Sequence, residues 1–334
     1  MNKVSAFAKL LRLPGIGALG VPTVIAALTV GETNIYNLIL VFIIGAIACV
    51  YGFILNDYAD IELDKLVDVT RKKPLASEAI SKKGALITTI FMMLLAFFFV
   101  SVLWYKQTLD IYKFLAILSI IIAGFLGSIY DIYGKKIVGS DFLVALSVAF
   151  IFLFGALAFA KPNIITWIIF VLTFNNLLYM NAIQNGIKDA DHDYKMGVRN
   201  IALKSGVKVD GDSLFIPLSF KVFGMGIRLF SACLLFAPFI IFGYEYHLWQ
   251  LIILAVFTLI FLFISTKLLS MKTFDRSKIR KIIGVQSFLR YSCVPVMLIS
   301  IIGLKYSILL IIFPIVWYII FTPFLGEKLF KPRM

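Results

Sequence analysis

Ten apolar stretches dominate the sequence, and each is about as long as a helix that crosses a lipid bilayer. A transmembrane α-helix needs about 20 consecutive, mostly apolar residues. Hydrophobic residues make up 61% of this 334-residue chain, whereas soluble domains contain about 45–50%. The composition therefore indicates an integral membrane protein, and the missing period-two alternation argues against a β-barrel. The stretches lie near residues 14–31, 35–55, 85–104, 112–130, 141–160, 163–185, 227–243, 248–270, 286–304 and 306–325.

The basic residues are unevenly shared between the loops that join these stretches. If the N-terminus is cytoplasmic and all ten stretches cross, only Lys106, Lys113, Lys161 and Lys305 are counted outside. The positive-inside rule then predicts a multi-pass protein of the cell membrane with its N-terminus and long loops in the cytoplasm. Attraction to anionic lipid explains the formal net charge of +14, so we expect membrane lipid as a partner and no nucleic acid.

The chain reads as one domain, because no Gly/Ser-rich or Pro-rich linker divides residues 1–334. Residues 1–13 are basic and amphipathic, which is typical of an interfacial N-terminal helix. The stretch at about 306–325 is interpreted as an extra transmembrane helix. The predicted fold class is all-α, a polytopic membrane bundle of nine to ten transmembrane helices.

Two clusters of acidic residues follow apolar stretches on the predicted cytoplasmic side. In the first, Asp57, Asp60 and Asp64 fall on one stripe of a continuing helix, with Asn56 at its edge. Glu62 points away from that stripe and is expected to face water or neighbouring cations.

In the second cluster, Asp189 and Asp193 are four residues apart and share a helix face, while Asp191 points nearly opposite. The spans "LNDYADIELD" and "QNGIKDADHDY" around the clusters are weakly similar, which suggests two topological repeats.

Carboxylates on one stripe repel each other unless a cation joins them. Mg²⁺ fits, because it takes oxygen ligands and is usually held by one or two carboxylates together with water and substrate phosphates. Two facing clusters can hold ions that clamp a diphosphate. The alternative is that these acids are simply solvated loop charges. The run "KTFDRSKIRK" (272–281) is interpreted as charge that sets the topology.

Several motifs resemble those of the UbiA superfamily of intramembrane prenyltransferases. "NDYADIELD" (56–64) matches the family's Asn-Asp-x-x-Asp-x-x-x-Asp motif without a gap, and "DADHDYKMG" (189–197) looks like its second Asp-x-x-x-Asp motif. "KKPLASEAIS" (72–81) is similar to the Arg-Pro-Leu-x-Ser-Gly segment, although Glu78 stands where the family usually has Gly. "LLRLPGIGALGVPT" (10–23) and "YDIYGKK" (130–136) resemble two further family segments.

The resemblance implies a helical bundle whose two Asp motifs meet over a central cavity. It further implies a Mg²⁺-dependent enzyme of lipid or quinone biosynthesis that transfers a polyprenyl group from its diphosphate to a lipophilic acceptor. The catalytic residues it implies are Asp57, Asp60, Asp64, Asp189 and Asp193, and the metal ligands it implies are these five with Asn56. The substrate-binding residues it implies at the diphosphate are Asn56, Arg71, Lys73, Lys135, Lys136 and Tyr130.

Two other functions are compatible with a polytopic protein that carries acids. A CDP-alcohol phosphotransferase would show Asp-Gly-x-x-Ala-Arg, but Asp57 is followed by Tyr58. A transporter or channel usually places its acids near mid-membrane, whereas both clusters lie at one face. Within the prenyltransferase reading, the acceptor stays open between an aromatic quinone precursor and a glycerol-phosphate ether lipid.

Overall fold

The computed structural model describes residues 3–66 and 70–323, so the predictions for residues 1–2 and 324–325 lie outside the described residues. The chain divides into two compact units. The first unit comprises residues 1–132, 150–166 and 312–334, and the second comprises residues 133–149 and 167–311.

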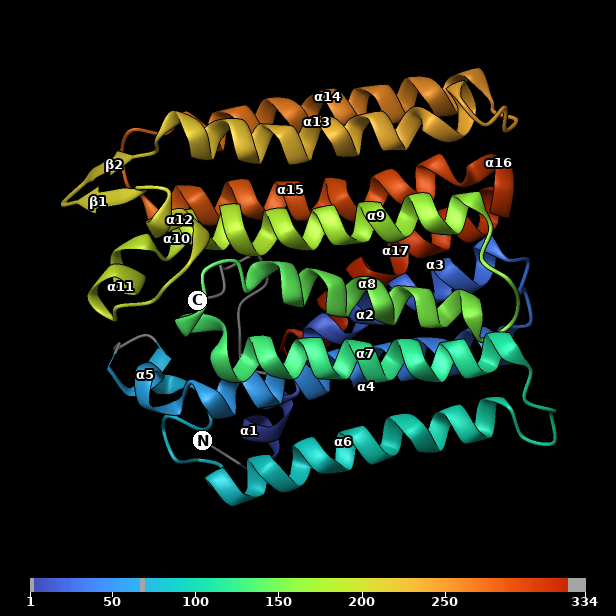
Figure 1. Ribbon diagram of the computed structural model, residues 1–334, viewed down its shortest axis with the longest axis horizontal. Coiled ribbons are helices and arrows are strands. Elements are labelled where there is room, and N and C mark those ends of the chain that lie inside the picture. The colour runs from blue at the N-terminus through green and yellow to red at the C-terminus, as the bar shows by residue number, and fades with distance from the viewer. Residues whose placement is uncertain (1–2, 67–69, 324–334) are drawn as a thin grey trace. The chain divides into compact units, whose positions relative to one another are not determined.

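The first unit begins with a series of short helices and continues into long ones (Figure 1). In chain order these are α1 (Lys3–Leu10), η1 (Leu13–Gly15), α2 (Ile16–Leu19), α3 (Val21–Thr29), α4 (Ile35–Ala59), α5 (Ile61–Lys65), η2 (Thr70–Lys72), α6 (Lys82–Leu103) and α7 (Ile111–Tyr133). Helix α8 (Asp141–Leu157) and helix α17 (Leu304–Phe321) each contribute residues to both units.

Helix α4 is the long central element of the first unit, and it packs along α6 and α3. It begins at Asn34, whose side chain accepts hydrogen bonds from the backbone N–H groups of Tyr36 and Asn37, as an N-cap residue does. The Thr23 hydroxyl donates to the Val41 carbonyl oxygen at 2.7 Å and so joins α3 to α4. Gly45 permits this approach, because a Cβ there would lie 2.6 Å from the Thr23 oxygen.

The second unit contains the remaining helices and one small hairpin. In chain order these are η3 (Gly134–Lys136), α9 (Ile164–Leu178), η4 (Tyr179–Asn185), α10 (Gly186–Lys188), α11 (Ala190–Lys195), α12 (Ile201–Lys204), β1 (Lys208–Asp210), β2 (Ser213–Phe215), α13 (Leu218–Ile240), α14 (Leu248–Leu269), α15 (Arg276–Met297) and α16 (Ile299–Ile302). Helices α13 and α14 run side by side, and α14 packs on α15. The segment η4 is a π-helix, a form that occurs often at functional sites.

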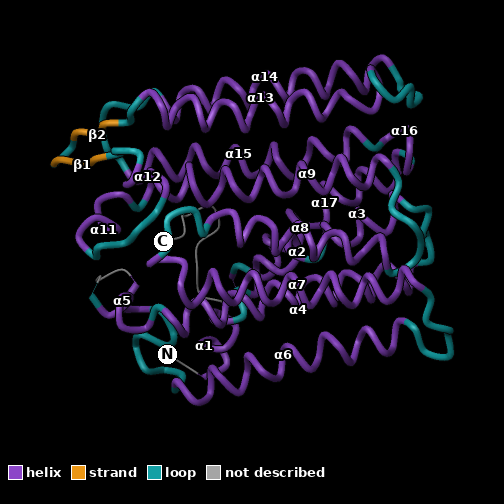
Figure 2. The backbone as a smooth tube through the Cα atoms, viewed as in Figure 1, coloured by secondary structure: helices purple, strands orange, loops and turns teal. Residues whose placement is uncertain are grey.

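The hairpin departs locally from the predicted all-α class. Strands β1 and β2 pair antiparallel with Lys208 opposite Phe215 (Figure 2). Gly211 (φ 55°) and Asp212 form the tight turn between them. A Gly supplies the positive φ that such two-residue turns require.

The helical membrane fold is confirmed, but the predicted count of nine to ten spans is not. Each predicted stretch overlaps a helix, yet among the described residues seven helices are long and apolar enough to cross. An eighth is added if Val4–Leu10 and Leu13–Thr29, which are bent by 44°, count as one span. Helix α8 has only 17 residues. Helix α15 contains the basic residues Arg276, Lys278, Arg280, Lys281 and Arg290.

Candidate active site

The first acid motif lies where α4 passes into α5. Helix α4 ends at Ala59, and Asp60 adopts a bridge conformation (φ −91°, ψ 2°) before α5 begins. The Asp60 N–H still donates to the Asn56 carbonyl oxygen at 3.0 Å, and the Asp64 N–H donates to that of Asp60 at 2.8 Å. Because this spacing keeps the helical repeat, Asp57, Asp60 and Asp64 share one buried stripe, with 5%, 7% and 7% of their surfaces exposed.

Two cations come to this stripe from other segments of the first unit. The Lys73 ammonium lies 3.0 Å from an Asp57 oxygen and 2.8 Å from an Asp64 oxygen. The Arg12 guanidinium lies 3.5 Å from Asp57 and stacks 4.0 Å from the centre of the Phe53 ring. Buried carboxylates are stable only when they are paired, so Lys73 and Arg12 allow the stripe to fold inside the protein.

The pKa values of Lys73 and Asp64 show how burial and pairing compete. Burial by itself would lower the pKa of Lys73, but the Asp57 and Asp64 carboxylates raise it above its ordinary value. Burial raises the pKa of Asp64, and Lys73 opposes that rise only in part. The site therefore holds its lysine charged.

Glu62 confirms the assignment of faces, because its side chain is exposed and pairs with Lys82 at 2.7 Å. That hydrogen bond and charge lower the pKa of Glu62. Arg71 is exposed as well, and its Nε donates to the Lys65 carbonyl oxygen at 3.0 Å. Of the two basic residues predicted in this segment, Lys73 contacts the acid stripe directly.

Glu78 explains the departure from the family pattern. It has a left-handed backbone conformation (φ 60°), which glycine adopts at no steric cost. Its carboxylate lies 3.0 Å from the Lys65 ammonium. The chain thus keeps the backbone turn that a glycine would favour, with an exposed ion pair beside it.

Sequence reasoning did not single out Asp131. This residue of α7 accepts a hydrogen bond from the Asn56 side chain and lies within electrostatic range of Asp57, Asp60 and Arg12. A Cβ at Gly52 would lie 3.6 Å from an Asp131 oxygen, an ordinary van der Waals distance, so Asp131 lies close to the backbone of α4. Asp131 stands in the "YDIYGKK" segment, so the signal was present. The predicted Tyr130 is its half-buried neighbour.

The second acid motif repeats the backbone geometry of the first within the second unit. Asp189 stands between α10 and α11 in a similar bridge conformation (φ −109°, ψ 6°). Its N–H donates to the Asn185 carbonyl oxygen at 2.9 Å, and the Asp193 N–H donates to that of Asp189 at 2.9 Å. Asn185, Asp189 and Asp193 therefore correspond to Asn56, Asp60 and Asp64. The sequence did not predict a role for Asn185, although this residue is part of the segment "QNGIKDADHDY" that is weakly similar to the first motif.

The carboxylates of the second motif have different surroundings. The Lys188 ammonium lies 3.2 Å from Asp189, whose side chain is 37% exposed. The Asn200 amide donates to Asp193 at 2.7 Å. Burial and the nearby Asp189 carboxylate raise the pKa of Asp193 to about 7, while Lys135 and Asn200 oppose the rise.

Lys135 and Lys136 differ in position. Lys135 is half-buried and acts electrostatically on Asp193, and its carbonyl oxygen accepts a hydrogen bond from the Arg199 N–H at 2.8 Å. Lys136 is exposed. The structure thus brings Lys135 to the second motif and leaves Lys136 at the surface.

Asp191 lies off the shared face and pairs with Arg276 at 2.5 Å. Arg276 also donates to the Lys188 carbonyl oxygen at 3.2 Å. The sequence interpretation of residues 272–281 as topology-setting charge was therefore incomplete, because Arg276 ties the start of α15 to the acid motif.

The residues of the first motif suit Mg²⁺ by their chemistry. Asp57, Asp60 and Asp64 offer the hard carboxylate oxygens that this ion binds, on one buried stripe. In the described residues no three acidic, His or Cys side chains are already grouped as a metal site, and the Lys73 ammonium lies between Asp57 and Asp64. A cation is therefore already part of the folded motif, and an arriving metal ion would share these carboxylates with it.

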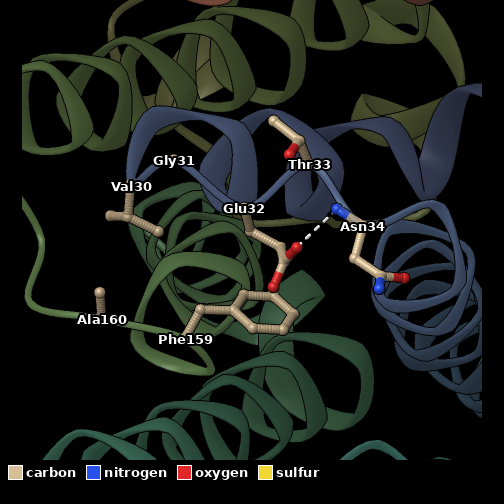
Figure 3. A pocket seen from close by; sticks show the side chains of 7 residues that line it. All are labelled: Val30, Gly31, Glu32, Thr33, Asn34, Phe159 and Ala160. Carbon is tan, nitrogen blue, oxygen red and sulfur yellow. Dashed lines mark hydrogen bonds between the residues drawn. The ribbon is translucent and has the colours of Figure 1, made fainter.

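An open hollow lies at the other end of α4, lined by residues of the α3–α4 connection and of 159–160 (Figure 3). Its volume is about 490 Å³. A Glu32 oxygen there accepts a hydrogen bond from the Asn34 N–H at 2.6 Å. Asn34 precedes α4 and Asp57 stands near its end, about 34 Å apart at 1.5 Å per residue. The hollow is therefore remote from the first acid motif.

Together these features define a multi-pass helical membrane protein with an acid motif at the end of a long helix in each unit. The family model for the UbiA prenyltransferase family matches residues 19–290. The chain belongs to this family, and the prediction of a membrane-embedded prenyltransferase is confirmed.

Individual relatives and solved structures agree with this membership. The chain is 27% identical to a digeranylgeranylglyceryl phosphate synthase of Methanococcus vannielii over 75% of this chain and 83% of that protein. It is 27% identical to a 4-hydroxybenzoate octaprenyltransferase of Haemophilus ducreyi over 68% of this chain and 74% of that protein. The fold is similar to that of a UbiA homologue from Archaeoglobus fulgidus bound to GPP and Mg²⁺, with a TM-score of 0.64 and 17% sequence identity. The match covers 89% of this chain and 99% of that one. It is also similar to an apo UbiA homologue from Aeropyrum pernix (TM-score 0.60, 16% identity, 88% and 96% coverage).

Proposed function

We propose that the protein moves a polyprenyl group from a polyprenyl diphosphate to a lipophilic acceptor, with Mg²⁺ held by the two acid motifs. The single observation that carries this proposal is the buried stripe of Asp57, Asp60 and Asp64 joined by Lys73. A membrane protein retains such a costly cluster only where it is paired and used. The Archaeoglobus homologue bound to GPP and Mg²⁺ supports the same ligands here.

The proposed roles follow from position. Asp57, Asp60 and Asp64 with Asn56 hold metal in the first motif, and Asp189 and Asp193 hold it in the second. Mg²⁺ supplies positive charge where the diphosphate oxygens become more negative as the C–O bond to the prenyl group breaks. In our proposal the carboxylates of both motifs are required for this step.

Basic residues complete the diphosphate site. Lys73 reaches the diphosphate from the first motif and Lys135 from the second, while Arg71 and Lys136, both exposed, contribute only after a movement of their side chains. Asp131 is assigned a positioning role, because it holds the Asn56 amide. Tyr130 is assigned to the prenyl end of the donor, where an aromatic face stabilises a developing carbocation.

The acceptor is an acidic lipid or an aromatic acid. The names of the relatives favour a glycerol-phosphate ether lipid or 4-hydroxybenzoate, and both are anionic and reach the protein from the membrane surface. We place the protein in the cell membrane with its N-terminus and both motifs in the cytoplasm. The excess of Lys and Arg on that side supports this orientation.

The test is an acceptor screen with purified protein in detergent, a radiolabelled prenyl diphosphate and Mg²⁺. We expect labelled product with one of the two acceptors, and none when EDTA replaces Mg²⁺. A matched pair of variants distinguishes loss of a site carboxylate from loss of a nearby charge. Asp60→Asn removes a carboxylate of the buried stripe, and Glu62→Gln removes the exposed carboxylate beside it. Equal product from both variants would contradict the assignment. Transfer of a phosphoalcohol group from a CDP-alcohol would replace the proposed reaction.

A further inference from the structure

The start of α15 brings two arginines to the second acid motif. Arg276 is the first residue of this helix and Arg280 follows four residues later. Residues four apart lie on the same face of a helix, and these two are about 6 Å apart along its axis at 1.5 Å per residue. Helix α15 packs against α10, the short helix directly before Asp189.

Arg276 fastens α15 to the backbone of the motif. Its Nε donates to the Lys188 carbonyl oxygen at 3.2 Å, and an Nη lies 2.5 Å from an Asp191 oxygen. Lys188 and Asp191 stand on either side of Asp189 in the sequence. Arg276 therefore holds the segment that contains Asp189, and its donors are used within the protein.

The β1–β2 hairpin holds the start of α15 as well. The Leu214 N–H donates to the Lys272 carbonyl oxygen at 2.8 Å, and the Phe274 N–H donates to that of Asp212 at 2.8 Å. The Asp275 side chain then caps the first turn of the helix. The connection into α15 thus has a defined conformation, which fixes where the arginines of its first turns lie.

Apolar packing fixes Arg280 in particular. Its neighbour Ile279 is fully buried and belongs to the same apolar cluster as Ile187 and Ala190. Those two residues lie within two positions of Asp189 along the chain. Arg280 is close enough to Asp189 for the two charges to interact. The helix therefore presents Arg280 beside a proposed metal ligand.

Arg280 differs from Arg276 because its donors are not all used. Its Nε is shut off from solvent and has no hydrogen-bond partner in the described part of the chain. The nearby carboxylates have other partners, since Asp189 pairs with Lys188 at 3.2 Å and Asp191 pairs with Arg276. A buried donor without an acceptor is costly, so Arg280 is suited to an acceptor that comes from a ligand.

The chemistry of the site indicates which ligand. A guanidinium has five N–H donors and no acceptor, and its planar fork matches the oxygens of a phosphate group. Two cations beside one carboxylate repel each other, so Arg280 and a metal ion at Asp189 are compatible when an anion contacts both. We propose that Arg280 binds an oxygen of the donor diphosphate beside the metal held at Asp189. This inference rests on the proposed function and adds a basic residue to it.

The first test titrates inorganic diphosphate into the purified full-length protein in detergent with Mg²⁺, by calorimetry. Arg280→Gln should lower the affinity about 10-fold or more, because it removes charge-assisted hydrogen bonds. Arg280→Lys keeps the charge without the fork and should lie in between. The control Lys281→Gln removes the same charge from the exposed neighbouring position and should bind as the wild type does. The affinity of Arg280→Gln for Mg²⁺ alone should equal or exceed that of the wild type, which shows that the motif is intact.

The second test separates the donor from the acceptor, whose anionic group has similar chemistry. In Arg280→Gln we expect the KM for the prenyl diphosphate to rise and the KM for the acceptor to stay unchanged. A rise in the KM for the acceptor alone would overturn the assignment to the donor. Equal diphosphate affinity in Arg280→Gln and Lys281→Gln would also overturn it, while Mg²⁺-dependent transfer by the wild type would leave the proposed function standing. A wild type that binds no diphosphate with Mg²⁺ would contradict both.

Discussion

The two acid motifs have the same backbone and different surroundings. In each, an Asn, an Asp and a second Asp follow at intervals of four, and the helix breaks at the middle Asp with similar dihedral angles. In each, the off-face acid is paired with the first residue of a neighbouring helix: Glu62 with Lys82 of α6, and Asp191 with Arg276 of α15. The two motifs are therefore similar in backbone structure as well as in sequence.

The difference arises at one position. Asp57 of the first motif corresponds to Gly186 of the second, where a Cβ would lie 2.7 Å from that of Ala202. The first motif thus gains a third carboxylate and attracts Lys73 and Arg12, whereas the second gains close packing against α12. We infer that the first motif is organised before ligands bind, and that the more exposed Asp189 can adjust when they do.

The largest effect is expected from removing the middle aspartate of either motif. Asp60→Ala or Asp189→Ala should lower turnover by about 10³-fold or more, because each removes a proposed metal ligand. Both variants should still insert into the membrane. The rate of prenyl transfer measures the loss of turnover, and the yield of protein from membranes measures insertion. Asp191→Asn is the control in the second motif, because Asp191 lies off the shared face. Wild-type rates of prenyl transfer in purified Asp60→Ala would contradict the assignment of Asp60 as a metal ligand.

Lys73→Met should lower the stability of the folded protein, because it changes the first motif and leaves the second unchanged. It leaves Asp57 and Asp64 without their shared cation, and removing one partner of a largely buried pair costs about 2 kcal/mol or more. Added Mg²⁺ should restore part of this loss, since the ion takes the place of the ammonium. Thermal unfolding with and without Mg²⁺ measures it, and Lys72→Met at the exposed neighbouring position is the control. A Tm that equals that of Lys72→Met would show that Lys73 does not hold the stripe.

Mg²⁺ binding should depend on pH through the second motif. The pKa of Asp193 is raised to about 7, so below that pH the metal must displace a proton from this carboxylate. The apparent affinity for Mg²⁺ should therefore fall as pH decreases from about 7 and reach a plateau above it. Mg²⁺ titrations between about pH 5.5 and 8 test this, and Asp193→Asn should flatten the profile. An unchanged profile in Asp193→Asn would assign the dependence to another group.

Gly186→Ala tests why the second motif lacks a third carboxylate. The added methyl group meets Ala202, and overpacking of this kind costs about 1–3 kcal/mol. Denaturation curves measure the loss, and Ala202→Gly in the same chain should recover most of it. If Gly186→Ala is as stable as the wild type, packing does not explain the glycine.

The smallest effect is expected at Glu78. Glu78→Gly removes a left-handed non-glycine residue, which costs roughly 1–2 kcal/mol, and loses an exposed ion pair of little value. The greater freedom of glycine in the unfolded chain offsets part of the gain. We expect a net stabilisation of about 0.5 kcal/mol from unfolding curves. Destabilisation by more than about 1 kcal/mol would mean that the Lys65–Glu78 pair holds the loop.

Residue spacing predicted a large part of this structure. The apolar runs located the helices, and helical periodicity placed Asp57, Asp60 and Asp64 on one face and Glu62 on another. Lys73 was predicted to touch diphosphate, but its pairing with Asp57 and Asp64 depends on a loop that periodicity does not describe. Arg12 and Arg276 approach from distant segments, so only the folded chain reveals that they reach the motifs, whereas Asp131 lies in the "YDIYGKK" segment that the sequence had already marked. The number of spans stayed unsettled because short or charged helices such as α8 and α15 do not follow a length rule.

We propose that cleavage of the donor diphosphate requires the carboxylates of both motifs. The most direct measurement is Mg²⁺-dependent release of inorganic diphosphate from geranylgeranyl diphosphate in the presence of the acceptor found by the screen. Wild type, Asp60→Asn and Asp189→Asn are compared at equal folded concentration. We predict release by the wild type with Mg²⁺, none with EDTA, and a similar loss in both variants. Full release by either variant, or release that continues in EDTA, would contradict the account.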